Sequence, residues 1–276
     1  MVMSVNTNVG AMIALQNLNA TNAQLATTQN RINTGKSVST AKDNGAIWAI
    51  AQGQRAEIGA LGAVKQSLDR GVAAVDVALA AGETVSDLLL QMKEKALAAT
   101  DASLTTSARS ALNEDFKALR DQIASVTTNA EFNGINLLET GATGFQALAN
   151  AQGTSSLTVG AEVMALGSTT VSVATTQSIE TLTKAAASLT AVSNSIDAVS
   201  GALARLGTKS KALSTHITFV GKLSDALESG VGNLVDADLA KESAKLQALQ
   251  TKQQLGVQAL GIANQTPQLV LSLFRS

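Results

Sequence analysis

Residues 182–234 read LTKAAASLTAVSNSIDAVSGALARLGTKSKALSTHITFVGKLSDALESGVGNL, and apolar residues recur in this stretch every seven residues at two positions. One set is Leu182, Leu189, Ile196, Leu203, Ser210, Ile217, Ser224 and Val231, and the other is Val192, Val199, Leu206, Leu213, Val220, Leu227 and Leu234. A seven-residue repeat keeps one side of a helix against a partner along its whole length. At 1.5 Å per residue, residues 179–234 therefore predict a helix about 80 Å long.

The first half of the chain carries a second stripe with the same spacing. Its two sets are Leu61, Leu68, Val75, Gly82, Leu89 and Ala96, and Val64, Gly71, Ala78, Val85, Met92 and Ala99. Glycine and alanine weaken a helix slightly but let another backbone approach closely. The two stripes predict two long helices that pack through small residues.

A third, shorter helix is expected to begin at about Ser107, which is a good N-cap residue type, and to end near residues 127–129. The Asn133-Gly134 pair that follows is a strong turn signal. One face of the expected helix carries Leu112, Phe116, Leu119, Ile123 and Val126.

Residues 137–176 differ in composition, because glycine, serine and threonine separate short alternating apolar runs. Alternation over residues 156–159 and 170–173 is typical of strands, although a flexible linker is an alternative interpretation. The predicted fold class is therefore mainly α. It is a long antiparallel helical coiled-coil rod with a small β-hairpin region between the N- and C-terminal arms.

Both ends of the chain lack charge. Residues 1–30 and 253–274 contain no Asp, Glu, Lys or Arg. Each end nevertheless carries apolar residues at helical spacing, which are Leu18, Leu25 and Ile32 at the N-terminus and Leu239, Leu246, Leu249 and Leu260 at the C-terminus. Such segments would expose an apolar face if they were alone, so we expect them to pair with each other or with neighbouring copies.

The composition excludes several kinds of chemistry. The 276 residues include no cysteine and one histidine, His216, so disulfides, thiolate zinc sites and paired-histidine sites are ruled out. A net charge of −1 gives no field for nucleic acid, and no apolar run has the roughly 18 to 20 residues that a membrane-spanning helix needs. We therefore expect no enzyme activity, no metal, no cofactor, no nucleic-acid partner and no membrane insertion.

Motifs in both arms closely resemble those of bacterial flagellins. The N-terminal motifs are Asn6-Thr7-Asn8, Arg31-Ile32-Asn33-Thr34-Gly35, Ser39-Thr40-Ala41-Lys42-Asp43 and Glu131-Phe132-Asn133-Gly134. The C-terminal motifs are Ala263-Asn264-Gln265-Thr266-Pro267-Gln268 and the ending Val270-Leu271-Ser272-Leu273-Phe274-Arg275. Because only residues 137–176 separate the arms, the chain resembles a short flagellin without large outer variable domains.

This resemblance implies a layered subunit. Residues 1–33 and 232–276 would form an inner terminal coiled-coil layer, and residues 45–231 an outer-tube helical layer that includes the hairpin region. Residues 34–44 would be a spoke linker that contains the charged pair Lys42 and Asp43. The resemblance implies a polymerisation interface that includes Leu18, Leu25, Ile32, Leu239, Leu246, Leu249, Leu260, Leu271, Leu273 and Phe274.

The implied function is that of a structural subunit of the flagellar filament, outside the cell, which drives swimming motility. The N-terminus does not read as a Sec-type signal peptide, because polar amides interrupt its apolar residues. Family membership implies type III export without a cleaved signal peptide. Its implied partners are other copies of the chain, the flagellar export apparatus, an export chaperone, the filament cap and hook-associated proteins.

Two surface features follow from the same resemblance. The family's host-receptor motif has two arginines before a glutamate, whereas this chain has Gln91 and Lys93 before Glu94. Lysine lacks the planar fork of arginine and glutamine also lacks the charge, so we expect a weakened receptor contact. The hydroxyl-rich region supplies candidate O-glycosylation residues, which are Thr143, Thr154, Ser155, Ser168 and Thr169.

Two alternative functions remain open. A hook–filament junction protein shares the architecture but is an adaptor present in few copies, and it usually departs from the Leu271-Ser272-Leu273 ending. A coiled-coil signalling rod is the other alternative, and it predicts charged seams at both ends. The uncharged first thirty residues argue against it.

Overall fold

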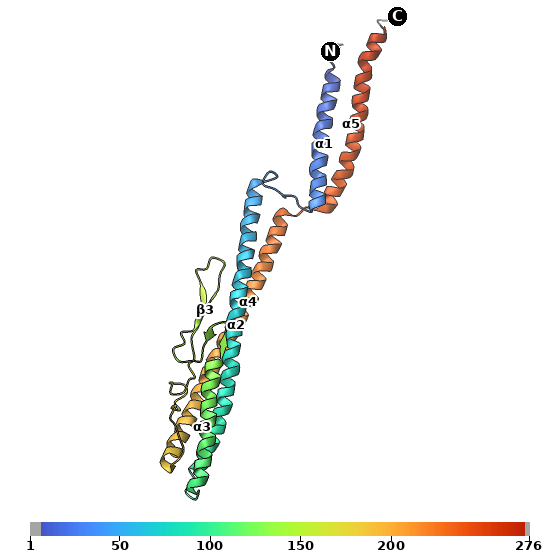
Figure 1. Cartoon of the computed structure of the whole chain (residues 1–276). Helices are drawn as coiled ribbons and strands as arrows, with labels where there is room; N and C mark the ends of the chain where they lie inside the picture. The colour runs from blue at the N-terminus through green and yellow to red at the C-terminus, as the bar shows by residue number, and fades with distance from the viewer. Residues whose placement is uncertain (1–6, 274–276) are drawn as a thin grey trace. The chain divides into compact units, whose positions relative to one another are not determined.

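The computed structural model describes residues 7–273, and it describes their side chains through residue 265. Figure 1 shows a chain of long helices with a small amount of β-structure, which confirms the predicted fold class. The elements in chain order are α1 (Val9–Thr34), α2 (Gly45–Ala99), α3 (Thr106–Asn129), β1 (Glu131–Phe132), β2 (Ile135–Asn136), β3 (Phe145–Leu148), β4 (Ser156–Val159), α4 (Leu182–Val235) and α5 (Leu239–Leu273).

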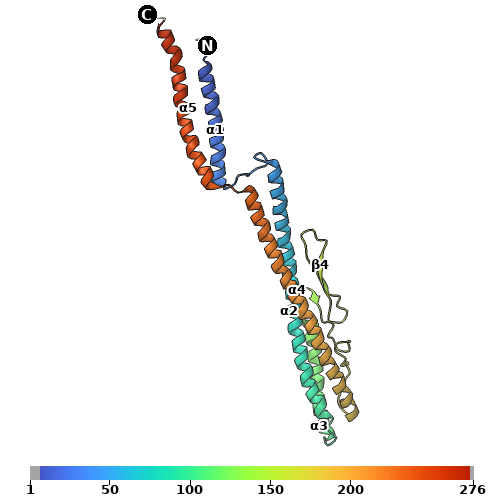
Figure 2. The ribbon, with the colours of Figure 1, turned by 180° about the vertical axis from the view of Figure 1, so that it is seen from behind.

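The chain divides into two compact units. One unit contains residues 1–56 and 226–276, and the other contains residues 57–225. In the second unit, α2 and α4 lie side by side, as Figures 1 and 2 agree. The Asp76 carboxylate on α2 accepts a hydrogen bond from Ser210 Oγ on α4 at 3.2 Å. A Cβ added at Gly82 of α2 would lie 2.7 Å from Leu203 Cδ2 of α4, so the helices approach closely where α2 has no side chain.

The stripe predicted on α2 is confirmed at every position, because all twelve of its residues are buried. On α4 one set forms the core, with Val192, Val199, Leu206, Leu213 and Val220 at most 2% exposed. The prediction was wrong for the other set, whose residues from 189 to 224 are only half-buried, while Leu182 is exposed at the start of the helix. Small residues occupy the second buried row of α4 instead, namely Ser188, Ser195 and Ala202, each fully buried.

Helix α3 packs through the predicted residues Phe116 and Ile123, both fully buried. Its N-cap is Thr105 rather than the expected Ser107, and Thr105 Oγ1 accepts a hydrogen bond from Ala108 N at 3.2 Å. The cap lies earlier because a hydroxyl at residue 105 can bond the amide three residues on while residue 107 is already helical. The helix ends at Asn129, as predicted.

The Asn133-Gly134 turn is confirmed between β1 and β2, because both residues have positive φ, at 51° and 80°. The expected strand at 156–159 is also confirmed, and it pairs antiparallel with β3 from Phe145↔Val159 to Leu148↔Ser156. The expected strand at 170–173 is wrong. Ser172 binds α4 instead of a neighbouring strand. Its amide donates a hydrogen bond to Ser195 Oγ at 3.0 Å, and its hydroxyl donates one to Ala191 O at 3.0 Å.

Gly144 should be the least replaceable residue of the β3–β4 hairpin. Its φ is +78°, and a Cβ added there would overlap the carbonyl oxygen of Val159 and lie 3.0 Å from the Cα of Gly160. We expect Gly144→Ala to destabilise the unit of residues 57–225 by about 1–3 kcal/mol, measured by urea unfolding. The matched control is Gly160→Ala, because nothing lies within 4 Å of an added Cβ at Gly160. Equal unfolding midpoints for the two variants would contradict this expectation.

Candidate assembly interface

Helices α1 and α5 form an antiparallel pair within the unit that contains both chain ends. The Asn8 side chain caps α1 by accepting a hydrogen bond from Ala11 N at 3.0 Å, and Gly35 ends the helix with φ 67°. Asp238 caps α5, because its carboxylate accepts from Lys241 N at 3.0 Å. Figure 1 shows the two helices side by side.

Three polar contacts at different positions along the helix axes join the pair. Asn8 Nδ2 donates to Ala263 O at 2.7 Å, and Gln253 Nε2 donates to Asn22 Oδ1 at 2.7 Å. Arg31 Nη1 lies 3.0 Å from Glu242 Oε1 and donates to it. In an antiparallel pair, the residue number rises along one helix as it falls along the other, so the two numbers of each contact have a nearly constant sum. The three contacts meet this condition and therefore belong to one register.

The seam between α1 and α5 buries few side chains. Four residues of α1 and α5 are at most 9% exposed, among those whose side chains the structure describes. They are Thr21, Thr28, Glu242 and Leu249. Three of these four are polar, so the apolar area buried between the helices is small. An isolated helical pair with so little apolar burial is marginally stable in water.

Seven of the ten predicted interface residues have side chains that the structure describes, and they differ in burial. Leu249 is buried in the seam, and five others are half-buried beside it, namely Leu18, Leu25, Ile32, Leu246 and Leu260. Leu239 was expected in the seam but is 50% exposed, and it is the first residue of α5. The side chains of Leu271 and Leu273, and all of Phe274, lie outside the described residues.

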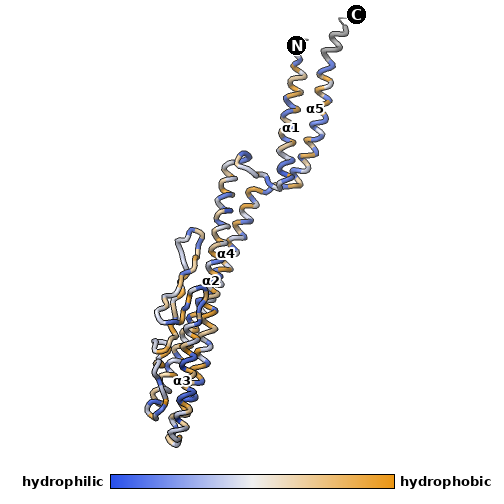
Figure 3. The backbone as a smooth tube through the Cα atoms, viewed as in Figure 1, coloured by the Kyte–Doolittle hydropathy of each residue, from blue (hydrophilic) through white to orange (hydrophobic). Residues whose placement is uncertain are grey.

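Both helices also expose apolar residues outside the seam. Eight of them are 48–67% exposed, namely Val9, Met12, Ile13, Leu15, Leu239, Leu255, Val257 and Ile262. Figure 3 shows apolar residues interleaved with polar ones along both helices. Val9, Met12 and Ile13 are three and four residues apart on α1, and exposed apolar residues grouped in this way mark surfaces that associate with other proteins. The α1–α5 pair is therefore the best candidate for an assembly interface.

The segment between α1 and α2 is held to the end of α4. Ser37 N donates to Val235 O at 2.7 Å, and Ala237 N donates to Gly35 O at 2.9 Å. Within the segment, one carboxylate oxygen of Asp43 accepts hydrogen bonds from the amides and hydroxyls of Ser39 and Thr40. The bond from the Thr40 amide, followed by that from the Ser39 hydroxyl, holds the pKa of Asp43 below its ordinary value.

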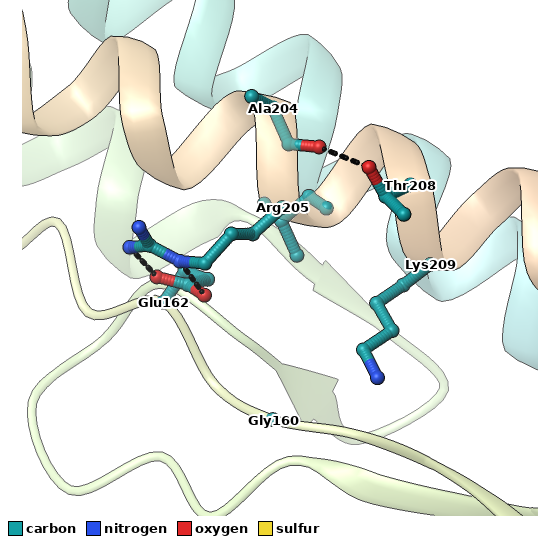
Figure 4. Close-up of a pocket in the computed structure, with 7 residues that line it drawn as sticks. Gly160, Glu162, Ala204, Arg205, Thr208 and Lys209 are labelled. Carbon is teal, nitrogen blue, oxygen red and sulfur yellow. Dashed lines mark hydrogen bonds and ion pairs between the residues drawn. The ribbon is translucent and has the colours of Figure 1, made fainter.

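The second unit contains a shallow cleft between α4 and the segment that follows β4. Its volume is about 400 Å³, and Figure 4 shows Arg205 reaching from α4 to Glu162 while Lys209 points beside Gly160. Both guanidinium–carboxylate contacts are short, at 2.7 and 2.6 Å. The ion pair raises the pKa of Arg205, first through the hydrogen bonds to Glu162. The Glu162 carboxylate therefore neutralises Arg205 within the cleft.

The described part of the chain offers little for metal binding or membrane insertion. Within residues 7–273 there is no group of three or more His, Cys, Asp or Glu side chains that could hold a metal ion. No helix over the same range is long and apolar enough to cross a membrane. His216 lies half-buried beside the hairpin, where Nε2 donates to Ala149 O at 2.8 Å.

Comparison with known proteins matches both arms of the chain. The model of the bacterial flagellin N-terminal helical region matches residues 5–143, and that of the C-terminal helical region matches residues 189–274. Flagellin FljK of Caulobacter vibrioides is 56% identical over 99% of this chain and 98% of its own length. The chain belongs to the bacterial flagellin family.

Flagellins from other bacteria match over the same extent. A flagellin of Brucella melitensis is 36% identical over 99% of each chain. Among solved structures, a flagellar hook-associated protein from Vibrio parahaemolyticus aligns with a TM-score of 0.56 at 16% identity, covering 70% of this chain and all of its own. That structure shows a shared fold.

The residues singled out from the flagellin resemblance lie on the surface. Gln91, Lys93 and Glu94 are exposed on α2, while Met92 between them is fully buried. Lys42 is exposed in the segment before α2. Of the candidate glycosylation residues, Thr143, Thr154, Ser155 and Thr169 are exposed, whereas Ser168 is half-buried. The Ser168 hydroxyl donates to Val163 O and accepts from Val171 N, so it is the least available of the five.

Sequence reasoning missed Thr21, Thr28 and Glu242, the polar residues of the flagellin seam. The signal was present, because Ala11, Leu18, Leu25 and Ile32 alternate with Ala14, Thr21 and Thr28 at the spacing of a seven-residue repeat. A search for leucine and isoleucine alone finds only half of that repeat. The buried row includes threonines because they are small enough to lie between closely spaced helices.

Proposed function

We propose that this chain is the structural subunit of a bacterial flagellar filament and that the α1–α5 pair is the surface through which copies polymerise. The observation that carries the proposal is the exposed apolar surface of this pair, on a chain of the flagellin family. A water-exposed apolar surface of this kind is stabilised when another copy covers it. The established family membership supports a structural role rather than a catalytic one.

The same surface explains why assembly would be cooperative. The seam buries mainly Thr21, Thr28, Glu242 and Leu249, so the pair gains most of its stability only when neighbours cover its outer face. Contacts between copies that are head-to-tail and do not close into a ring generate an open helical polymer. Folding of the chain ends and growth of the filament would then depend on each other.

The expected layers are part of this proposal. Residues 1–33 and 232–276 would form the inner layer of the filament, and residues 34–44 would be the spoke that joins it to the outer tube of residues 45–231. The hydrogen bonds that hold residues 35–38 to residues 235–237 support a defined joint at this point. The proposed interface includes the ten residues that the resemblance implied, together with Val9, Met12, Ile13, Leu15, Leu255, Val257 and Ile262.

The location and the partners follow from the same role. A flagellar filament lies outside the cell, so the chain would be exported, and membership of the flagellin family favours type III export without a cleaved signal peptide. The export apparatus, an export chaperone, the filament cap and hook-associated proteins would be its further partners. A chain without cysteine suits this route, because no disulfide has to form before or after export.

Electron microscopy of the purified chain tests the proposal. On addition of short filament fragments as seeds, we expect filaments many times longer than the seeds, because each added copy covers the apolar surface of the last. A junction protein would instead add a short, terminating cap, and a signalling rod would not add to the seeds at all. Seeds that keep their starting length would therefore exclude a bulk filament subunit.

The altered receptor motif leads to a separate prediction. Gln91 and Lys93 are exposed on α2, and neither offers the bidentate fork of an arginine. We expect purified monomer to give a weak or absent response in reporter cells that carry the flagellin-sensing Toll-like receptor. The double variant Gln91→Arg and Lys93→Arg should raise the response. A response of the parent chain equal to that of a strong agonist would contradict the prediction.

A further inference from the structure

The pairing register of α1 and α5 is poorly specified by apolar residues. The observed register places Leu18 beside Gly256, where an added Cβ would lie 3.9 Å from Leu18 Cβ, and Gly10 beside Ala263. A slip of α5 by seven residues would bring Leu18 opposite Ala263 and Ile32 opposite Leu249. Apolar residues would still face apolar residues, because the repeat on both helices has the same period.

Charge distinguishes the two registers. Arg31 is the one charged residue in α1, and Glu242 is the one acidic residue in α5. Their side chains are 33% and 11% exposed and meet at 3.0 Å. After the slip, Arg31 would lie opposite the region of Gln250, and α5 holds no other acid that it could reach.

The surroundings make separation of this pair costly. Glu242 Oε2 and Thr28 Oγ1 are both buried and have no hydrogen-bond partner. The Glu242 carboxylate therefore depends on its contact with Arg31, through Oε1, for compensation of its burial. A buried charge that loses its partner is strongly disfavoured, whereas polar pairs at single positions of a helical seam are well suited to fix register.

We propose that the Arg31–Glu242 ion pair sets the register in which α1 and α5 pair. The Asn22–Gln253 hydrogen bond supports the same register at a second position along the helices. The consequence for assembly rests on the proposed function. Because every copy would pair its ends identically, every copy would present the same apolar surface to its neighbours.

Engineered disulfides can read the register directly, because the chain has no cysteine of its own. The pair Leu18→Cys and Gly256→Cys reports the observed register, since a Cβ–Cβ separation of 3.9 Å suits a disulfide. The pair Leu18→Cys and Ala263→Cys reports the register slipped by seven residues. Both pairs are oxidised in the full-length monomer under the same conditions, and the crosslinked fractions are compared by mass spectrometry.

With Arg31 and Glu242 intact, we expect the first pair to crosslink in preference to the second. Arg31→Glu should raise the ratio of slipped to observed crosslink by about tenfold or more. The exchange Arg31→Glu with Glu242→Arg should restore the original preference. The control is Lys252→Glu, which makes the same change of charge at an exposed position of α5 and should leave the ratio unchanged.

Three results would overturn the inference: an unchanged ratio in Arg31→Glu, no restoration by the exchange, or loss of both crosslinks together. In the last case the ion pair would hold the helices together without selecting their register. The crosslinks are measured in the monomer, so they do not depend on polymerisation. If the ratios change as expected but the unsubstituted chain does not extend the seeds, the register inference stands and the proposed function fails.

Discussion

Removal of residues 253–276 is expected to abolish filament formation. The deletion takes away the half of α5 that pairs with the N-terminal half of α1, including the contacts of Gln253 with Asn22 and of Ala263 with Asn8. It also removes Leu255, Val257 and Ile262 from the proposed interface. Because the seam is thin along its whole length, we do not expect the remaining half to support assembly.

Sedimentation and electron microscopy after seeding measure this effect directly. The expected change is from mostly polymerised to no detectable filament, while the truncated chain stays soluble and keeps a cooperative thermal transition from the unit of residues 57–225. A matched control is Thr251→Ala, which alters an exposed residue just before the deleted segment. Filaments of normal length from the truncated chain would refute the claim that pairing of the ends drives assembly.

Leu89→Ala is expected to have the largest effect on stability. Leu89 of α2 is fully buried, so its replacement removes apolar contacts and leaves a cavity that close-packed helices fill only in part. The expected loss is about 2–5 kcal/mol in the free energy of unfolding. For a unit of this size, that loss lowers the melting temperature by roughly 5–15 °C.

The neighbouring residue provides the control. Leu90 is 52% exposed on the same helix, so Leu90→Ala removes an identical side chain with little loss of contact. We expect its effect on the monomer to stay within about 0.5 kcal/mol. Circular dichroism during heating of both variants measures the difference. Similar melting temperatures for the two variants would mean that the core of α2 is not where the structure places it.

The long helices could be predicted because their spacing is periodic. All twelve positions of the α2 stripe are buried, and one of the two sets on α4 forms the core. The other set failed because Ser188 and Ser195 occupy the buried row that a search for large apolar residues assigns elsewhere. A repeat indicates which side of a helix is covered, but small polar residues can be covered as completely as leucine.

Local signals predicted the turns better than the strands. The Asn133-Gly134 turn needs two residues of positive φ, and that requirement is visible in the residue types themselves. Alternation at residues 170–173 is equally clear, yet these residues do not form a strand. Val171 and Val173 are buried, while Ser172 forms hydrogen bonds with Ser195 Oγ and Ala191 O of α4. Hydrogen bonds to α4 determine the conformation of this segment, and the alternation of residues within one segment gives no sign of them.

The pairing of the two chain ends was predicted in outline, but its geometry was not. The uncharged ends and their apolar spacing indicated helices that need partners, but Leu239, which was expected in the seam, is 50% exposed. The register depends on contacts between residues more than two hundred positions apart, such as Arg31 with Glu242. Such contacts leave no trace in the spacing of either helix alone.

The thin seam between α1 and α5 makes the stability of the chain ends a function of subunit concentration. Anything that binds only the folded pair stabilises it by mass action, and here the binder is another copy of the same chain. In dilute solution, backbone amides of α1 should exchange with deuterium much faster than those of α2 near Leu89. Within a filament the local concentration of copies no longer falls on dilution, so the ends should stay protected long after free subunits have been washed away.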